Sequence, residues 1–500
     1  MKLIKYRNVP ILFTFIFLLI LSACSSDSGK KNKTVKEYNP DTGTNFMSPL
    51  STYIYGKYAS EIQGNLELMP GSFIAWKGNG SLSWEVEIPD KDEYEFYIIA
   101  NVGSQGNGIK ITVQTEKEEF PFSLLPTSGP FPGGENFQVQ EAKNFQRLKL
   151  SGLISLEDGK QKIVISTSGI EKEGILFDFR SAELLPLSKK KEIANEEARA
   201  KAARASVDWL VKTGYGLMFH WTSQSVLPDG SNKKFEDAVN DFDVEKFANM
   251  VEETGAGYVL LTIGHAKSYC PAPLKSWERI HPGNTTQRDL IEEIANALNK
   301  RGVRLLCYLN EPLAFKFPRN KLSTNEEHQA FVANYTDILT EMGNRYQNKI
   351  AGYWFDSWYQ IFENYPDVPF EEFFKLCKIG NKDRIICLNP WIYPDVSPWQ
   401  DYWSGEVQDP IGIPENGYMK NGPSPNLPYQ ALLTMEKHLW VQQETDISDP
   451  KFTPEQLSTY IKSCMDNGGF VTINLAIYQD GTVGKKALQL MKEVKETIRK

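Results

Sequence analysis

The spacing of apolar residues divides the chain into two regions. Between residues 46 and 187, short runs alternate apolar and polar positions, as in SLSWEVEI (81–88) and KIVISTSG (162–169), with Gly, Pro and Asn between them. Alternation with period two places one face of a strand in a core and the other in solvent. The pattern predicts an N-terminal antiparallel β-sandwich over 46–187. Further strand candidates are 93–102, 108–115, 145–156 and 175–187.

The pattern changes after a charged, Ala-rich stretch at 188–206, which we interpret as a helical linker. From residue 207, continuous apolar runs such as VLLTI and VRLLCYL alternate with amphipathic segments. Strands covered by helices on both faces have this continuous character. We therefore predict a (β/α)8 TIM barrel over 207–500. Its strand candidates are 214–221, 257–263, 303–309, 352–356, 384–389, 402–407, 439–442 and 470–475. Its helix candidates are 243–254, 286–301, 324–346, 370–380, 454–467 and 485–500.

The N-terminus has the features of an export signal. Basic residues precede an apolar run at 11–21 that is too short for a typical spanning helix. The run ends in Leu-Ser-Ala-Cys, which resembles a bacterial lipobox and implies a signal peptide over 1–24 with lipidation of Cys24. Residues 25–45 then form a polar, flexible tether. The implied location is the bacterial cell envelope, on the outer membrane or periplasmic face; an ordinary signal peptide with a chance cysteine is the alternative.

Charge and cysteine content exclude several classes of partner. The net charge is −8, and no basic cluster lies outside the extreme N-terminus and the linker. Phosphate binding needs clustered Lys and Arg, so nucleic acid is not an expected partner. The five cysteines after Cys24 lack metal-type spacing, so we expect no metal site in the barrel. No second apolar stretch is long enough to span a membrane, which leaves the lipid as the expected membrane contact.

The stretch IAGYWFDSWYQ (350–360) is the strongest candidate for chemistry. Its apolar run ends on Asp356, with Trp354 and Trp358 close by in sequence. Catalytic groups of barrels lie at the C-terminal ends of strands. Aromatic planes beside a carboxylate suit a sugar, which has an apolar face and an anomeric carbon open to attack. The alternative is a helix-capping Asp among core aromatics.

Most of the other predicted barrel strands also end on polar or aromatic side chains. Strand ends converge in a barrel, so we expect one pocket. A pyranose needs such a set, because it presents many hydroxyls and one apolar face. The residues are His220, Trp221, His265, Asn310, Glu311, Asn389, Trp391, Trp403, Glu406, Asp409, Trp440, Gln442 and Asn474.

Four consecutive segments carry a family resemblance. GLMFHW (216–221), 242–265, 287–312 and GYWFDSW (352–358) resemble, in order and spacing, glycoside hydrolase family 29, the retaining α-L-fucosidases. The resemblance runs over roughly residues 207–480. It implies an exo-acting hydrolase that removes a terminal sugar from glycans by double displacement, with no cofactor required for catalysis.

The resemblance also implies roles for individual residues. Asp356 would be the nucleophile, and His220 and His265 would hold sugar hydroxyls. Glu406 is our choice for the acid/base, and Glu311 is its rival. The expected substrate-binding set is His220, Trp221, His265, Glu311, Trp354, Trp358 and Trp403.

One motif departs from the family. After the second strand the family has His-His-Asp-Gly-Phe, whereas this chain has His-Ala-Lys-Ser-Tyr at 265–269. The change leaves open a different terminal sugar, such as a deoxy, galacto-configured or charged one. It also keeps a second class of function open: a non-catalytic glycan-binding surface lipoprotein.

The N-terminal region has a looser resemblance. Its order of strands and Gly-rich loop resembles the carbohydrate-binding modules of families 6 and 35 over 46–187. Such modules often bind sugars and often carry a structural calcium ion, so both are expectations. The alternative is a spacer that holds the barrel away from the membrane.

Overall fold

The computed structural model describes residues 46–127, 145–172, 174–318, 323–406, 427–436 and 440–500. The predicted signal peptide, Cys24, the tether and Asp409 lie outside these residues. No helix in the described parts is long and apolar enough to cross a membrane. The N-terminal sheet and the barrel described below belong to one compact unit, Tyr38–Lys500.

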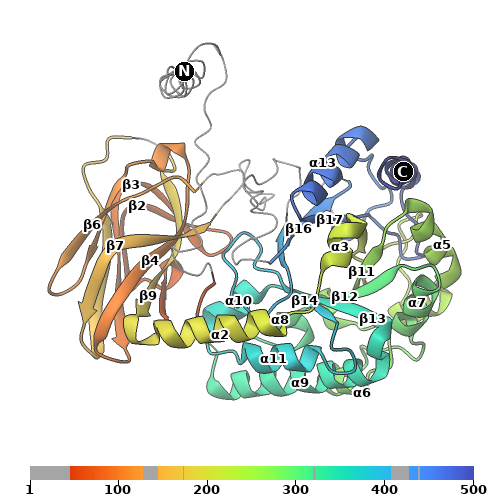
Figure 1. The fold of residues 1–500 in the computed structure, drawn as a ribbon, viewed down its shortest axis with the longest axis horizontal. Helices are drawn as coiled ribbons and strands as arrows, with labels where there is room; N and C mark the ends of the chain where they lie inside the picture. The colour runs from red at the N-terminus through yellow and green to blue at the C-terminus, as the bar shows by residue number, and fades with distance from the viewer. Residues whose placement is uncertain (1–45, 128–144, 173, 319–322, 407–426, 437–439) are drawn as a thin grey trace, which may run out of the picture. The chain divides into compact units, whose positions relative to one another are not determined.

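The N-terminal region forms a nine-stranded sheet of antiparallel pairs (Figure 1). Its central order is β6-β5-β8-β3-β9-β4-β7, with β1 paired to β9 and β2 to β3. The predicted alternation is clear in the second half of β3, where Trp84 and Val86 are buried while Glu85 is exposed. The antiparallel strands are thus confirmed, whereas a division into two stacked sheets stays a prediction. The strands are β1 (Thr52–Tyr55), β2 (Glu61–Met69), β3 (Phe73–Ile88), β4 (Asp92–Val102), β5 (Lys110–Gln114), β6 (Glu119–Ser123), β7 (Gln146–Leu156), β8 (Gly159–Thr167) and β9 (Phe177–Pro186).

The hairpin of β2 and β3 was not expected from the sequence. Strand β2 is almost entirely exposed, so it lacks the alternating apolar residues that mark a half-buried strand. Its partner β3 begins at Phe73, eight residues before the predicted start at 81. The turn between them contains Gly71, whose φ of 91° is a left-handed conformation that favours glycine.

Helix α2 (Lys190–Ala203) joins the sheet to the barrel, as the charged composition indicated. Helix α3 (Asp208–Thr213) follows it and precedes the first barrel strand.

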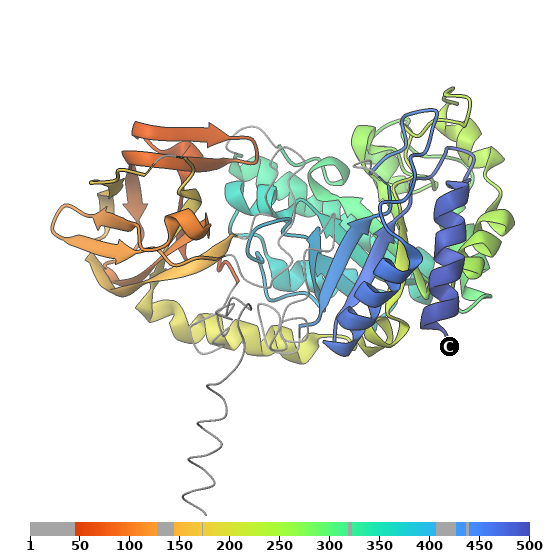
Figure 2. The same ribbon diagram turned by 90° about the horizontal axis from the view of Figure 1, so that it is seen from above.

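The C-terminal region is a nearly closed barrel of eight parallel strands (Figures 1 and 2). The order is β14-β13-β12-β11-β10-β17-β16-β15, and every neighbouring pair is parallel. The eight parallel strands predicted from the sequence are therefore confirmed in number and direction. The strands are β10 (Tyr215–Phe219), β11 (Tyr258–Gly264), β12 (Arg304–Asn310), β13 (Ile350–Asp356), β14 (Ile385–Leu388), β15 (Trp403–Glu406), β16 (Tyr429–Thr434) and β17 (Phe470–Asn474).

The seventh strand was predicted at the wrong place. The sequence favoured 439–442, but β16 (Tyr429–Thr434) occupies this position in the sheet. The run YQALLT is short and follows a Pro- and Asn-rich segment, which obscured it. Trp440 and Gln442 therefore lie in the segment after the strand rather than on it.

Amphipathic helices pack outside the strands (Figures 1 and 2). Their ends follow local capping chemistry: Asp243 accepts a hydrogen bond from the backbone N–H of Lys246, and Thr324 forms a capping box with Glu327. The main outer helices are α5 (Val244–Thr254), α7 (Leu290–Asn299), α9 (Asn325–Tyr346), α11 (Phe370–Cys377), α13 (Pro454–Asp466) and α14 (Lys485–Ile498). Shorter helices are α4 (Phe235–Asp241), α6 (Lys275–Ile280), α8 (Glu311–Ala314) and α10 (Trp358–Asn364).

Alternate residues of each barrel strand face two different apolar layers. On β13, Trp354 belongs to the cluster inside the barrel, whereas Tyr353 and Phe355 belong to the layer between strands and helices. Period-two geometry then places Asp356 on the inner face, two positions beyond Trp354.

The barrel has a seam between β14 and β15, where the described strands form no backbone ladder. Side chains replace the ladder there. Asp401 accepts a hydrogen bond from the backbone N–H of Ile386 (2.7 Å), and Gln400 accepts one from that of Leu388 (3.1 Å). The backbone N–H of Asp401 also donates to the carbonyl of Ile386 (2.8 Å).

Candidate active site

Asp356 ends β13 and is held by three donors. The hydroxyl of Tyr308 donates to its Oδ2 (2.6 Å), and so does Nδ2 of Asn310 (3.1 Å). Nδ2 of Asn389 donates to its Oδ1 (3.0 Å). Since each partner supplies an N–H or O–H, the carboxyl acts only as an acceptor, as an ionised carboxylate does. Three donors also fix its orientation.

Glu406 ends β15, across the seam from Asp356. Nδ2 of Asn389 donates to Glu406 Oε1 (2.6 Å) as well as to Asp356 Oδ1 (3.0 Å). The two acceptor oxygens are thus no more than about 5.6 Å apart, the two bond lengths laid end to end. One amide therefore joins two carboxyl groups from opposite sides of the seam.

Glu406 holds its proton unusually strongly. Burial raises its pKa, the nearby Asp356 charge raises it further, and the Asn389 hydrogen bond lowers it, which leaves the pKa at about 8. The carboxyl is therefore protonated at neutral pH while it stays only partly exposed. A proton donor next to an acceptor-only carboxylate is the pairing that acid-assisted displacement requires.

Tyr308 connects this pair to the barrel core. Its ring stacks on Trp354, with centroids 5.3 Å apart and an interplanar angle of 20°. Burial, and next the charge of Asp356, raise the pKa of Tyr308 well above its usual value, so it remains a donor. Trp354 donates from Nε1 to Gln430 (2.8 Å) and is 1% exposed. Trp354, expected to bind substrate, thus lies beneath Tyr308 and supports it.

Two histidines lie on the other side of Tyr308. The rings of His220 and His265 are 5.5 Å apart and perpendicular, and their centroids are 5.0 Å and 5.8 Å from that of Tyr308. Nδ1 of His220 is 3.0 Å from Oδ1 of Asn474. Burial, and next His265, lower the pKa of His220 to about 3, so the ring is neutral. The structure thus brings Asp356, Glu406, His220 and His265 together at the strand ends.

Of the other predicted tryptophans, Trp440 lies beside His220, with ring centroids 5.3 Å apart, whereas Trp221, Trp358 and Trp403 do not join this cluster. Trp221 is 2% exposed and packs against Phe242, with centroids 5.2 Å apart. Trp358 is fully buried, and its ring lies 5.0 Å from that of Phe373. Trp403 is also buried and belongs to the layer outside the strands. None of the three presents a free ring face on which a sugar could stack, so substrate binding by Trp221, Trp358 and Trp403 is not supported by their positions.

Glu311 and Lys267 are two further residues of interest near the strand ends. Glu311 is the first residue of α8, and its side chain lies outside the described part, so its role as rival acid stays a prediction. Lys267, from the motif that departs from the family, is exposed and has a left-handed φ of 64°. Its charge is accessible to solvent rather than enclosed among the strand-end residues.

Sequence reasoning missed two residues of chemical interest, Tyr308 and Glu436. Tyr308 precedes Asn310 by two positions, so strand alternation alone would have placed both on the inner face. Glu436 follows β16 and is 2% exposed; burial raises its pKa to about 8. Its Oε2 accepts from the backbone N–H of Ala476 (3.0 Å), and its Oε1 has no hydrogen-bond partner among the described residues. The misplaced seventh strand concealed Glu436.

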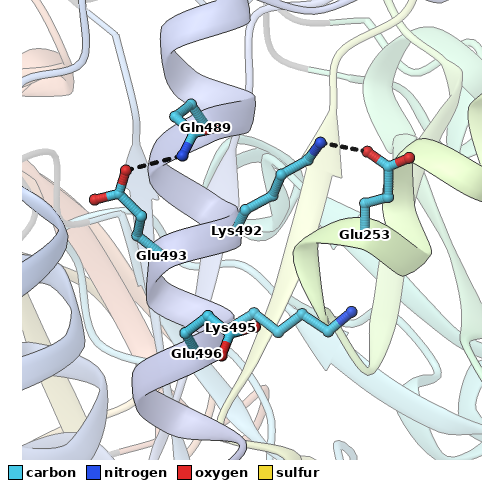
Figure 3. Close-up of a pocket in the computed structure, with 6 residues that line it drawn as sticks. All are labelled: Glu253, Gln489, Lys492, Glu493, Lys495 and Glu496. Carbon is cyan, nitrogen blue, oxygen red and sulfur yellow. Dashed lines mark hydrogen bonds and ion pairs between the residues drawn. The ribbon is translucent and has the colours of Figure 1, made fainter.

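A hollow on the outer surface is unlike this site (Figure 3). It lies between α5 and α14, and its side chains pair with each other: Lys492 with Glu253 (2.6 Å), and Gln489 with Glu493 (3.0 Å). It has no aromatic residue, so it offers no stacking surface. The lining residues are Glu253, Gln489, Lys492, Glu493, Lys495 and Glu496.

The described residues show no clustered metal ligands. They contain no group of three or more His, Cys, Asp or Glu side chains placed to hold a metal ion. The calcium ion expected in the N-terminal region stays a prediction, because backbone carbonyls can also bind calcium.

Comparisons with known proteins identify the family. A family model described as Alpha-L-fucosidase matches residues 186–499, and no curated protein matches the chain. Among solved structures, a family 29 α-L-fucosidase from Bacteroides thetaiotaomicron is 18% identical, with a TM-score of 0.46, covering 59% of this chain and 73% of its own. Isoenzyme 1 from Paenibacillus thiaminolyticus is 19% identical, with a TM-score of 0.45 and coverage of 60% and 76%. AlfC from Lactobacillus casei, in complex with α-L-fucose, is 18% identical, with a TM-score of 0.40 and coverage of 58% and 96%. Since the family model covers more than half of the chain, this protein belongs to the α-L-fucosidase family of glycoside hydrolases.

Proposed function

We propose that this protein is an exo-acting, retaining α-L-fucosidase that removes a terminal sugar from glycans by double displacement. The observation that carries the proposal is the Asn389 amide shared by Asp356 and Glu406, which limits the separation of their oxygens to about 5.6 Å. Retaining glycosidases hold their two carboxyl groups about 5 to 5.5 Å apart, and inverting ones about 6.5 to 9.5 Å apart. The shorter distance leaves no room for a water molecule between Asp356 and the anomeric carbon.

In the first step, Asp356 attacks the anomeric carbon and Glu406 gives its proton to the departing glycosidic oxygen. The sugar is then bound covalently to Asp356, and Glu406 is ionised. In the second step, Glu406 takes a proton from water, whose oxygen attacks the anomeric carbon and releases Asp356. Because its pKa is raised, Glu406 carries the proton for the leaving group at neutral pH. The three donors around Asp356 orient its carboxylate for attack on the anomeric carbon.

The two histidines beside Tyr308 supply hydrogen bonds to sugar hydroxyls. A neutral imidazole offers one donor and one acceptor, which matches a hydroxyl without adding charge. His220 and His265 lie perpendicular to each other beside Tyr308, so their ring nitrogens point in different directions and suit different hydroxyls of a bound sugar. Because the motif at 265–269 departs from the family, a galacto-configured terminal sugar is the comparison to test.

The experiment measures hydrolysis of an aryl α-L-fucoside, with an aryl galactoside in parallel. Asp356→Asn should lower kcat by about 10³-fold or more. Glu406→Gln should slow a poor leaving group far more than a dinitrophenolate, which departs without a proton. Azide should rescue the truncated variants with opposite product stereochemistry: retained for Glu406→Ala and inverted for Asp356→Ala.

Two matched variants decide the assignments. Glu311→Gln tests the rival acid, and Glu436→Gln tests the second buried carboxyl with a raised pKa. If either gives the leaving-group dependence expected of Glu406→Gln, the acid/base assignment is wrong. Binding of fucosides by the wild-type protein without any turnover would instead support a glycan-binding lipoprotein.

We also infer that Cys24 carries the lipid that holds the enzyme in the cell envelope. The support is the apolar run and the lipobox-like tetrad before it. Cys24→Ala should abolish labelling by radioactive palmitate and move activity out of the membrane fraction. Unchanged labelling would disprove the anchor while leaving the catalytic assignment intact.

A further inference from the structure

Three aromatic rings lie together beside the two carboxyl groups. The centroid of Tyr359 is 5.4 Å from that of Trp391 and 5.5 Å from that of Tyr393, and Trp391 meets Tyr393 edge to face at 5.6 Å. Tyr393 is buried, whereas Trp391 and Tyr359 are partly exposed. We call these two partly exposed rings the aromatic platform.

The platform is connected directly to the acid pair. The backbone N–H of Trp391 donates to Oδ1 of Asn389 (3.1 Å), the amide whose nitrogen holds both carboxyl groups. Tyr359 lies three residues after Asp356, on α10, and burial, followed by the charge of Asp356, raises its pKa. Both platform residues are therefore linked to the acid pair, Trp391 through Asn389 and Tyr359 through the helix that follows Asp356.

The N-terminal sheet supports the platform from behind through Arg180 on β9. Arg180 is 1% exposed, and its Nη2 donates to the carbonyl of Tyr359 (3.1 Å). Its guanidinium carbon lies 3.5 Å from the centroid of Tyr393, a close cation–π contact. Nε and Nη1 have no hydrogen-bond partner among the described residues, so the aromatic rings are the main compensation for burying this charge.

The same sheet also contacts the platform at the turn between β2 and β3. The hydroxyl of Tyr393 donates to the carbonyl of Gly71. A Cβ at Gly71 would lie 3.2 Å from the Trp391 ring, closer than ordinary contact. The N-terminal region also holds helix α10 in place, because its Lys57 forms a largely buried ion pair with Glu363 of that helix (2.8 Å). The sheet thus determines where both platform rings lie.

From these contacts we propose that Trp391 and Tyr359 form a binding subsite for the leaving-group sugar, stacking on its apolar face. We further propose that Arg180 of the N-terminal sheet is a positioning residue for that subsite. The inference rests on the proposed function, since Glu406 as proton donor puts the departing oxygen on this side of the acid pair. The N-terminal sheet is then a working part of the active site rather than a separate sugar-binding module.

The test compares two substrates of the full-length protein. One is α-L-fucosyl fluoride, whose leaving group has no ring; the other is a disaccharide of L-fucose α-linked to galactose or N-acetylglucosamine. The readout is the ratio of kcat/KM for disaccharide over fluoride. Trp391→Ala should lower this ratio about tenfold, mainly through KM for the disaccharide. Its backbone N–H, and thus its bond to Asn389, is retained.

Arg180→Met should lower the same ratio, and Arg180→Lys should restore part of it. The matched control is Arg147→Met, because Arg147 is another buried arginine of the sheet, paired with Glu183 (2.5 Å) rather than with the platform. It should cost stability without changing the ratio. If Arg180→Met fails to fold, Gly71→Ala is the substitute, since its added Cβ would displace Trp391.

An unchanged ratio in Trp391→Ala would overturn the subsite, and an unchanged ratio in both Arg180→Met and Gly71→Ala would overturn the positioning role. Failure of the proposed function gives a different result: the wild-type protein would hydrolyse neither substrate. In that case, quenching of tryptophan fluorescence by the disaccharide decides the inference. Loss of the quenching in Trp391→Ala would support it, and unchanged binding would refute it.

Discussion

Replacing Asn389 by leucine should move the alkaline limit of activity upward. Leucine keeps the volume of the side chain but removes the N–H that donates to Glu406 (2.6 Å). That N–H favours the ionised form of Glu406, so its loss favours the protonated form. Hydrogen bonds to charged groups contribute about 1.5 to 3 kcal/mol, and one pKa unit corresponds to about 1.36 kcal/mol. From a pKa of about 8, the limit should therefore rise by roughly 1 to 2 units.

The assay is the pH dependence of kcat/KM for an aryl α-L-fucoside, which reports the acid and base of the free enzyme. The alkaline limb should lie near the pKa of about 8 in the wild type and higher in Asn389→Leu, with a lower plateau because Asp356 loses a donor. Since the two carboxyl groups interact, the alkaline limb reports an apparent pKa that belongs to the pair.

Asn310→Leu is the matched control for this prediction. Asn310 donates to Asp356 (3.1 Å) and to the hydroxyl of Ser357 (3.1 Å), whereas the amide that lowers the pKa of Glu406 is that of Asn389. It should reduce the rate with little displacement of the alkaline limb. A limb that stays fixed in Asn389→Leu, or that moves equally in both variants, would refute the assignment of Glu406 as the protonated partner.

Three other changes test separate parts of the structure. Tyr308→Phe removes the 2.6 Å donor to Asp356 and should lower kcat by about 10- to 100-fold, measured under saturating aryl fucoside; an unchanged kcat would show that this donor is dispensable. Trp358→Ala should cost about 3 to 5 kcal/mol of unfolding free energy in urea without raising KM, since the ring is wholly buried; raised KM at normal stability would instead return Trp358 to the substrate. Glu436 has a pKa raised from 4.5 to about 8, so its neutral form favours folding and its contribution is lost as pH rises from about 4.5 to 8. Relative to wild type, the unfolding free energy of Glu436→Gln in urea titrations should therefore increase by roughly 2 to 4 kcal/mol between pH 5 and pH 8. No increase would contradict the burial of Glu436 in its protonated form.

Local patterns were enough to predict most of the fold. The run before Asp356 is apolar and ends on a charge, so strand β13 and its end were evident from the sequence. Helices such as α5 and α9 have both amphipathic spacing and capping residues. The exposed strand β2 has neither burial nor alternation, so only its pairing with β3 identifies it.

The tryptophans show where sequence reasoning reached its limit. An indole near a strand end can face the barrel interior, the helices or the substrate, and composition does not distinguish these directions. Trp354 faces inward and Trp403 outward because they occupy opposite phases of their strands. The exposed ring near the carboxyl groups, Trp391, is instead positioned by Gly71, which lies some 320 residues earlier in the chain. Contacts over such distances leave no local pattern to read.

The seam between β14 and β15 has a mechanical consequence. Asp356 and Glu406 lie on opposite sides of this seam, where the described strands form no backbone ladder. The width of the seam therefore sets the distance between the nucleophile and the proton donor. The side chains of Gln400 and Asp401 hold the seam together by accepting hydrogen bonds from the backbone of β14. Substitutions at those two positions can therefore retune the spacing of the reacting groups without any contact with the sugar.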